Sequence, residues 1–202
     1  MHWHGLNHQQ SQWEDGVPGT SQCPIAPGQS YTYSFRATPH GTTWYHSHFS
    51  AQYEDGMWGP LVIYGPETAS YDEDLGTVSI TDYFHAGYRE ILDGILGTDP
   101  SKWRPVSDNN LINGKMDASC VNNTKSSSCA EDLAKFSFSS GKKHRLRLIN
   151  TGIQSIQQFK IDGHKMMVIA NDFTQIEPYE TDVVTLGVCR PNLLLDLAAN
   201  PL

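Results

Sequence analysis

The sequence has little positive charge: 14 Lys and Arg residues stand against 22 Asp and Glu residues, a formal net charge of −8 over 202 residues. This balance argues against a nucleic-acid partner, because such proteins need a basic face to displace phosphate counterions. No run approaches the ~20 consecutive apolar residues of a transmembrane helix, so no membrane association is expected. Met1 leads directly into His2-Trp3-His4 rather than into a signal peptide, and we expect the natural beginning of the chain to be missing.

Cysteine is also scarce, with four residues and no Cys-x-x-C pair. That spacing disfavours a thiolate zinc site and a thioredoxin-like motif. Cys120 and Cys129 flank a polar stretch that contains an N-glycosylation acceptor at Asn122. A local disulfide closing a glycosylated loop would suit an oxidising compartment, so we expect a secreted, extracellular protein. Two free thiols beside a chance acceptor sequence are the alternative.

Alternating apolar and polar residues predict short strands along most of the chain, most clearly at 31–36 and 145–148. Gly and Pro residues separate these stretches, and only 88–96 has the spacing of a helix of any length. Regularly spaced short strands between turns favour an all-β fold of β-sandwich type. Further strands are expected at residues 60–64, 78–83, 135–138, 158–161, 166–170 and 182–188.

A domain boundary is expected where a strand-like run ends in Gly65-Pro66 and an acidic stretch follows. We predict a first unit at 1–66, a linker at 67–78 and a second unit at 79–202. The first unit is shorter than the about 100 residues of a closed immunoglobulin-type sandwich. It is therefore expected to be only part of a domain.

Four of the nine histidines form two His-x-His pairs, His2/His4 and His46/His48. On a strand, residues i and i+2 point to the same face, so each pair projects two imidazoles side by side. Two such strands placed together would bring four nitrogen ligands into one volume. Imidazole suits copper, zinc, iron and nickel, so the pairs predict a metal site.

Two other metal-site families fit the pairs less well. A zinc hydrolase with a His-x-His-x-Asp motif needs a carboxylate close after one pair, and neither pair has one there. A cupin motif needs a Gly and a Glu at fixed distances from its His-x-His pair. Gly41 and Glu54 each miss those distances from the second pair by at least one residue.

The stretches around both pairs resemble those of multicopper oxidases, specifically fungal, ascomycete-type laccases. The resemblance covers nearly the whole chain to about Val188 and is most specific in the first 66 residues. Residues 111–115, 145–150 and 161–164 resemble the second domain of that family. In the first part of the chain, the matching stretches are His2-Trp3-His4-Gly5, 13–19, 22–25, 41–50, 52–56 and 59–61.

The resemblance implies cupredoxin-like Greek-key β-sandwiches, with an incomplete first domain and most of a second. It implies copper as the cofactor, with four ions in the intact parent enzyme. By the same resemblance, His2 binds the type 2 copper and His4, His46 and His48 bind the type 3 pair. These residues would form half of a trinuclear cluster at which dioxygen is reduced to water.

The resemblance also assigns a role to Asp15, which matches an acidic residue near the cluster that helps to deliver protons. A turn-forming Asp before Gly16 is the alternative. His8, His40 and His144 are expected at the surface or in turns.

Two local departures from the family affect what the resemblance implies. The family places a carboxylate that orients the phenol in the loop corresponding to 150–158, and this loop contains no acid. The substrate preference of the parent enzyme is therefore in doubt. After Val188, the family has a Gly-Gln-Arg turn where this chain has Cys189-Arg190-Pro191-Asn192. A frameshift, a retained intron or a cloning boundary near residue 189 is one hypothesis.

No cysteine has a histidine neighbour, so the His-Cys-His stretch of the family's blue copper site is absent from this sequence. We expect the third cupredoxin domain of the parent chain to be missing and the chain alone to be inactive. The parent is expected to be a laccase that oxidises small phenolic or aromatic donors with dioxygen. The alternatives are a ferroxidase or ascorbate oxidase, or a non-catalytic, truncated copper-binding cupredoxin fragment.

Overall fold

The computed structural model describes residues 1–116 and 133–188 in full, and the backbone of 195–199. Strands dominate these parts of the chain and α1 (Tyr88–Leu96) is the one α-helix in them, which confirms the predicted all-β class. Short 3-10 turns occupy Gln12–Glu14, Gln52–Asp55 and Pro100–Lys102. The strands are β1 (His2–Trp3), β2 (Gly41–His46), β3 (Trp58–Ile63), β4 (Glu73–Tyr83), β5 (Asn109–Ile112), β6 (His144–Asn150), β7 (Gln157–Phe159), β8 (Met166–Asn171), β9 (Thr174–Thr181), β10 (Val184–Leu186) and β11 (Leu195–Ala199).

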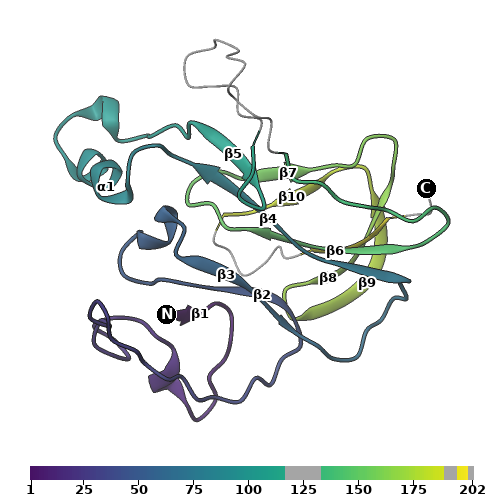
Figure 1. The fold of residues 1–202 in the computed structure, drawn as a ribbon, viewed down its shortest axis with the longest axis horizontal. Helices are drawn as coiled ribbons and strands as arrows, with labels where there is room; N and C mark the ends of the chain where they lie inside the picture. Colours follow the sequence, from purple (N-terminus) through teal and green to yellow (C-terminus); the bar gives the residue numbers. More distant parts are fainter. Residues whose placement is uncertain (117–132, 189–194, 200–202) are drawn as a thin grey trace.

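The described strands form three sheets (Figure 1). β1, β2 and β3 make an antiparallel sheet in the first part of the chain. A larger sheet has the order β5-β4-β6-β11-β8-β9, in which β4 and β6 run parallel and the other pairs are antiparallel. β7 and β10 form a separate antiparallel pair.

The main core lies on one face of the larger sheet, where β4, β6 and β8 each contribute alternate residues and β10 packs against them. Period-2 alternation explains this, because every second side chain of a strand points to the same face. Apolar residues at those positions are removed from water, which is the main favourable contribution to folding. The buried members are Val78, Ile80, Leu146, Leu148, Met166, Val168, Val184 and Leu186.

The other face of β6 packs against the first part of the chain. Ile149 forms a buried cluster with Trp44 of β2. Arg147 donates from Nη1 to Thr42 Oγ1 at 2.8 Å and forms an ion pair with Asp74 at 2.6 Å. All seven residues of β6 are buried, so this strand is covered on both faces.

Half of the predicted linker at 67–78 belongs to a strand, since β4 already begins at Glu73. Acidic residues of this segment pair with arginines of β6: Glu67 with Arg145, and Asp74 with Arg147, each at 2.6 Å. The acidic stretch that suggested a solvated linker is therefore held against a basic strand, which explains the earlier start of β4.

Two predicted strands are not strands in the structure. Residues 31–36 and 135–138 have no ladder partner among the described residues. Tyr33 and Phe35 pack their rings against Trp3 instead, and Phe136 and Phe138 pack against the main core. Their alternation reflects burial of one side of the chain, which does not require pairing with another strand.

Helix α1 has the predicted bounds, 88–96. Its N-terminal residue, Tyr88, donates its backbone N–H to Asp55 Oδ1 at 2.9 Å. Asp55 lies in the turn before β3, so a carboxylate from the first part of the chain caps the N-terminus of α1. Negative charge is favoured at a helix N-terminus, because the first backbone N–H groups there have no partner within the helix. Among the described residues, no helix is both long enough and apolar enough to cross a bilayer.

Candidate metal centre

The pairing of β1 with β2 brings the two His-x-His pairs together. The antiparallel register sets His2 directly opposite His46. His4 lies one residue beyond β1, where its backbone N–H donates to the carbonyl of Trp44 at 3.1 Å. Thr43 Oγ1 donates to the carbonyl of His4 at 2.7 Å, which fixes the chain at this point. The register therefore places side chains that are more than 40 residues apart in sequence on one surface.

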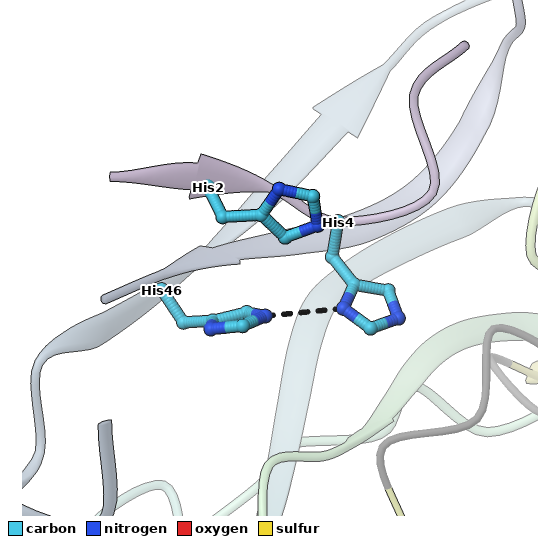
Figure 2. A group of neighbouring side chains, drawn as sticks. All are labelled: His2, His4 and His46. Atoms are coloured by element: carbon cyan, nitrogen blue, oxygen red, sulfur yellow. Dashed lines mark hydrogen bonds between the residues drawn. The ribbon is translucent and has the colours of Figure 1, made fainter. Parts of the chain in front are cut away.

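Three of the predicted ligands converge on one point (Figure 2). One ring nitrogen from each of His2, His4 and His46 lies within 4.8 Å of those of the other two. His4 Nδ1 and His46 Nε2 face each other at 3.1 Å. The His48 ring lies 5.2 Å from the His2 ring, centroid to centroid, but outside this three-nitrogen group. All four imidazoles line one cavity of about 220 Å³.

Backbone carbonyls set which nitrogen two of these rings present. His2 Nδ1 lies 2.8 Å from the carbonyl oxygen of Asp15, and His46 Nδ1 lies 2.9 Å from that of Ser47. A carbonyl oxygen only accepts, so both Nδ1 atoms carry the proton and donate it. The Nε2 atoms of His2 and His46 therefore carry the lone pairs that metal ligation requires, and that of His46 accepts a hydrogen bond from His4 Nδ1.

The electrostatics of the cluster favour neutral imidazoles. Burial, reinforced by the neighbouring histidines, lowers the pKa of His4 to about 4. Burial also lowers the pKa of His46 to about 4, with smaller contributions from the other histidines. Both rings are thus uncharged at neutral pH, which is the state that binds a metal cation. Neutral nitrogen donors of this kind fit copper or zinc.

Asp15 lies beside this cluster, at the end of the turn Gln12–Glu14. Its Oδ1 is 3.2 Å from His2 Nδ1, so both its carbonyl and its carboxylate face that ring nitrogen. Gly16 follows with φ of +77°, and a Cβ there would overlap the carbonyl oxygen of Met1. The Asp-Gly pair therefore makes a turn, and the turn brings the carboxylate to His2.

Two histidines expected at the surface or in turns have buried side chains. His144 accepts a hydrogen bond from the backbone N–H of Ser139 on Nε2 at 3.0 Å, and that nitrogen lies 3.4 Å from Glu73 Oε2. His8 packs its ring edge-on against Phe35, with centroids 4.7 Å apart. The expectation for His144 was wrong, because this residue lies in β6 and its polar sequence neighbours gave no sign of the distant residues that cover its ring. His8 does lie in a turn, closed by the hydrogen bond from the Ser11 N–H to its carbonyl, but its side chain is buried.

Asp82 is a residue that the sequence did not single out. It is buried, and its carboxylate accepts three backbone N–H groups, from Ile153, Gln154 and Ser155, at 2.8 to 2.9 Å. The acid-free loop that follows β6 is therefore held by a carboxylate from β4. The only hint in the sequence is its position on the predicted strand 78–83.

Some predicted features lie outside the described residues. The candidate disulfide Cys120–Cys129 and the glycosylation acceptor Asn122 fall within 117–132. The departure from the laccase pattern after Val188 falls within 189–194.

Comparison with known families identifies the chain. Two family models, each described as multicopper oxidase, match residues 1–68 and 74–190. The chain belongs to the multicopper oxidase family. This agrees with the resemblance found in the sequence, and it accounts for a cluster of histidines at the edge of a small β-sheet.

Individual relatives point to fungal multicopper oxidases. Laccase-2 of Botryotinia fuckeliana is 48% identical over 190 residues, which cover 93% of this chain and 32% of that protein. Dihydrogeodin oxidase of Aspergillus terreus is 40% identical over 200 residues, which cover 93% of this chain and 31% of that protein. The chain thus spans about a third of the length of these curated relatives.

Solved structures share the fold. The laccase of Botrytis aclada superposes with a TM-score of 0.84 at 45% identity, over 98% of this chain and 36% of that one. Fet3p, described as a multicopper oxidase that functions in iron import, superposes with a TM-score of 0.84 at 29% identity. The superposition covers 99% of this chain and 35% of that one. Copper is therefore the metal that this family implies for the histidine cluster.

Proposed function

We propose that this chain is part of a laccase-type multicopper oxidase that oxidises small phenolic or aromatic donors and reduces dioxygen to water. The observation that carries this proposal is the convergence of His2, His4 and His46 within 4.8 Å. The 48% identity to a protein named Laccase-2 supports the laccase type within the family.

The residues present fit copper. His2 would hold a type 2 copper, and His4, His46 and His48 would hold type 3 coppers. When bound, copper supplies one-electron redox chemistry, which no amino-acid side chain of the cluster provides. The chain's own contributions are neutral, lone-pair nitrogens, backbone carbonyls that fix two of the rings, and the carboxylate of Asp15 against His2.

The cavity beside the histidines limits what the chain can do alone. Among the residues that line it, the four histidines are the only imidazoles. We therefore propose that a further domain of the parent protein completes the cluster and supplies the blue copper site. By this proposal, the 202-residue chain binds copper but does not turn over a phenol.

The ferroxidase alternative is less well supported. Fet3p, whose description names iron import, and the Botrytis aclada laccase superpose equally well, so the fold does not separate a laccase from a multicopper oxidase of iron import. Identity does favour laccase, at 45% against 29%. No observation in this chain favours ascorbate oxidase.

The test compares the chain with the longer polypeptide that carries it, both loaded with copper. Oxygen consumption is followed with a methoxyphenol, with Fe(II) and with ascorbate as donors. We expect no turnover by the chain, and phenol oxidation by the longer polypeptide that exceeds oxidation of Fe(II). Oxygen-consuming turnover by the chain alone, or a preference of the longer protein for Fe(II), would contradict the proposal.

We also propose that the parent protein is secreted, with a glycan on Asn122 and a disulfide between Cys120 and Cys129. The support is the sequence of this loop alone. Intact mass of protein recovered from culture medium, with and without endoglycosidase, should show a carbohydrate mass lost on treatment. Alkylation of unreduced protein that labels both cysteines would disprove the disulfide.

A further inference from the structure

His8 is the most deeply buried imidazole of the first part of the chain that is not a predicted ligand. Its side chain is 3% exposed, and neither ring nitrogen has a hydrogen-bond partner. A buried polar group without a hydrogen-bond partner destabilises the folded state, so its presence needs a compensating reason.

The backbone is bent to bury this ring. His8 has φ of +42° and Gln10 has φ of +61°, a region that residues other than glycine rarely adopt. The backbone N–H of Ser11 donates to the carbonyl of His8 at 2.9 Å, which closes the turn. Backbone strain of this kind persists only where the surrounding structure enforces it, and it is concentrated at functional sites.

The buried ring faces the carboxylate beside the metal cluster. His8 Nε2 lies 3.8 Å from Asp15 Oδ1. The same Oδ1 lies 3.2 Å from Nδ1 of His2. One carboxylate oxygen therefore lies between a predicted metal ligand and a second imidazole whose ring nitrogens have no hydrogen-bond partner.

We propose that His8 is a positioning residue of the metal centre, which holds the Asp15 carboxylate against His2 Nδ1. A carboxylate at that nitrogen orients the ring and raises the basicity of the opposite nitrogen, Nε2, which faces the cluster. This inference rests on the proposed function, because it requires His2 to be a metal ligand.

A matched pair of variants tests the inference in the full chain. His8→Gln keeps an amide donor at about the distance of Nε2, whereas His8→Asn carries the same amide too short to reach Asp15. Asn also tolerates the left-handed backbone at this position, so folding is preserved. His164→Gln removes a histidine in the turn before β8 and controls for adventitious copper binding.

Copper affinity is measured by competition with a chromophoric chelator, and the bound Cu²⁺ is examined by electron paramagnetic resonance. We expect His8→Asn to weaken binding about tenfold and to change the nitrogen hyperfine pattern, as loss of a residue that supports a ligand does. His8→Gln and His164→Gln should stay within about twofold of the unmodified chain. In an Asp15→Asn background, His8→Asn should add almost nothing, because the two residues act through one carboxylate.

Equal binding by the Asn and Gln variants, or an equal loss with and without Asp15, would overturn the role of His8. Absence of copper binding at the histidine cluster in the unmodified chain would instead overturn the proposed function. The two failures are therefore distinguishable. Circular dichroism in the near ultraviolet confirms that each variant remains folded.

Discussion

The strongest stability prediction concerns Arg147, which joins the two parts of the chain. Its side chain is 2% exposed and contacts Asp74 at 2.6 Å through Nη2 and at 3.0 Å through Nε. Nη1 donates to Thr42 Oγ1 of β2, the strand that carries His46. Arg147→Met keeps most of the buried aliphatic volume and removes every one of these polar contacts.

The expected cost follows from what the substitution leaves behind. Removing one partner of a buried ion pair typically destabilises by 3–5 kcal/mol, because the other charge stays buried without compensation. The Asp74 side chain is 23% exposed, so water reaches it in part and the lower end of that range applies. We expect a loss of about 3 kcal/mol, which lowers the Tm of a chain of this size by about 6–12 °C.

Thermal denaturation with chemical-denaturant unfolding measures the effect. Lys160→Met is the matched control: it breaks an ion pair of 2.8 Å whose side chains are 65% and 89% exposed, and it should leave the Tm almost unchanged. The double variant Arg147→Met with Asp74→Leu should recover much of the loss. A change in Tm below 2 °C for Arg147→Met, or a double variant whose loss is the sum of the single losses, would refute the reasoning.

Three further predictions concern the metal site and the loop after β6. His46→Ala should weaken copper binding by more than about 100-fold, a greater effect than the removal of a residue that only supports a ligand. Chelator competition measures the affinity, and a change within threefold would contradict the ligand assignment. In the metal-free chain, the lowered pKa values of His4 and His46, about 4 each, mean that the unfolded state binds more protons below pH 6.5. The free energy of unfolding is therefore greatest above pH 6.5 and falls towards pH 4, with a loss of about 2 kcal/mol per histidine at pH 5. Replacing both histidines by Gln should flatten this pH dependence, which urea titrations at several pH values measure. Asp82→Asn should cost about 2 kcal/mol and speed hydrogen exchange at the amides of 153–155; unchanged exchange there would show that its carboxylate does not hold the loop.

Local patterns predicted much of the secondary structure. The spacing of 88–96 predicted the helix with its observed bounds, and alternation located β3, β6, β7, β8 and β10 to within two residues. The predicted end of β4 was correct, but that strand begins five residues earlier than predicted. Alternation failed at 31–36 and 135–138, where one-sided burial comes from packing without a paired strand. It also missed β5 and β9, since neither has a continuous apolar face.

The metal site was predicted in its residue types more fully than in its geometry. The two His-x-His pairs are visible in sequence, but β1 ends at Trp3 and β2 ends at His46. The second histidine of each pair lies just beyond its strand. His4 lies one residue beyond β1 and is held by the hydrogen bond from its backbone N–H to the carbonyl of Trp44, whereas His48 lies two residues beyond β2. His4 therefore joins the three-nitrogen group and His48 does not, although the two pairs have the same spacing in sequence.

By itself, the sequence determined which side chains carry the chemistry, because residue type and short-range spacing are local properties. The family resemblance, the imidazole ligands and the alternation that builds the core all follow from such properties. Only the tertiary structure decided which groups meet. The strand register sets His2 opposite His46, packing buries both faces of β6 around two arginines, and a strained turn brings His8 to Asp15. Each of these arrangements depends on contacts between residues that are distant in sequence, and such contacts form only when the chain folds.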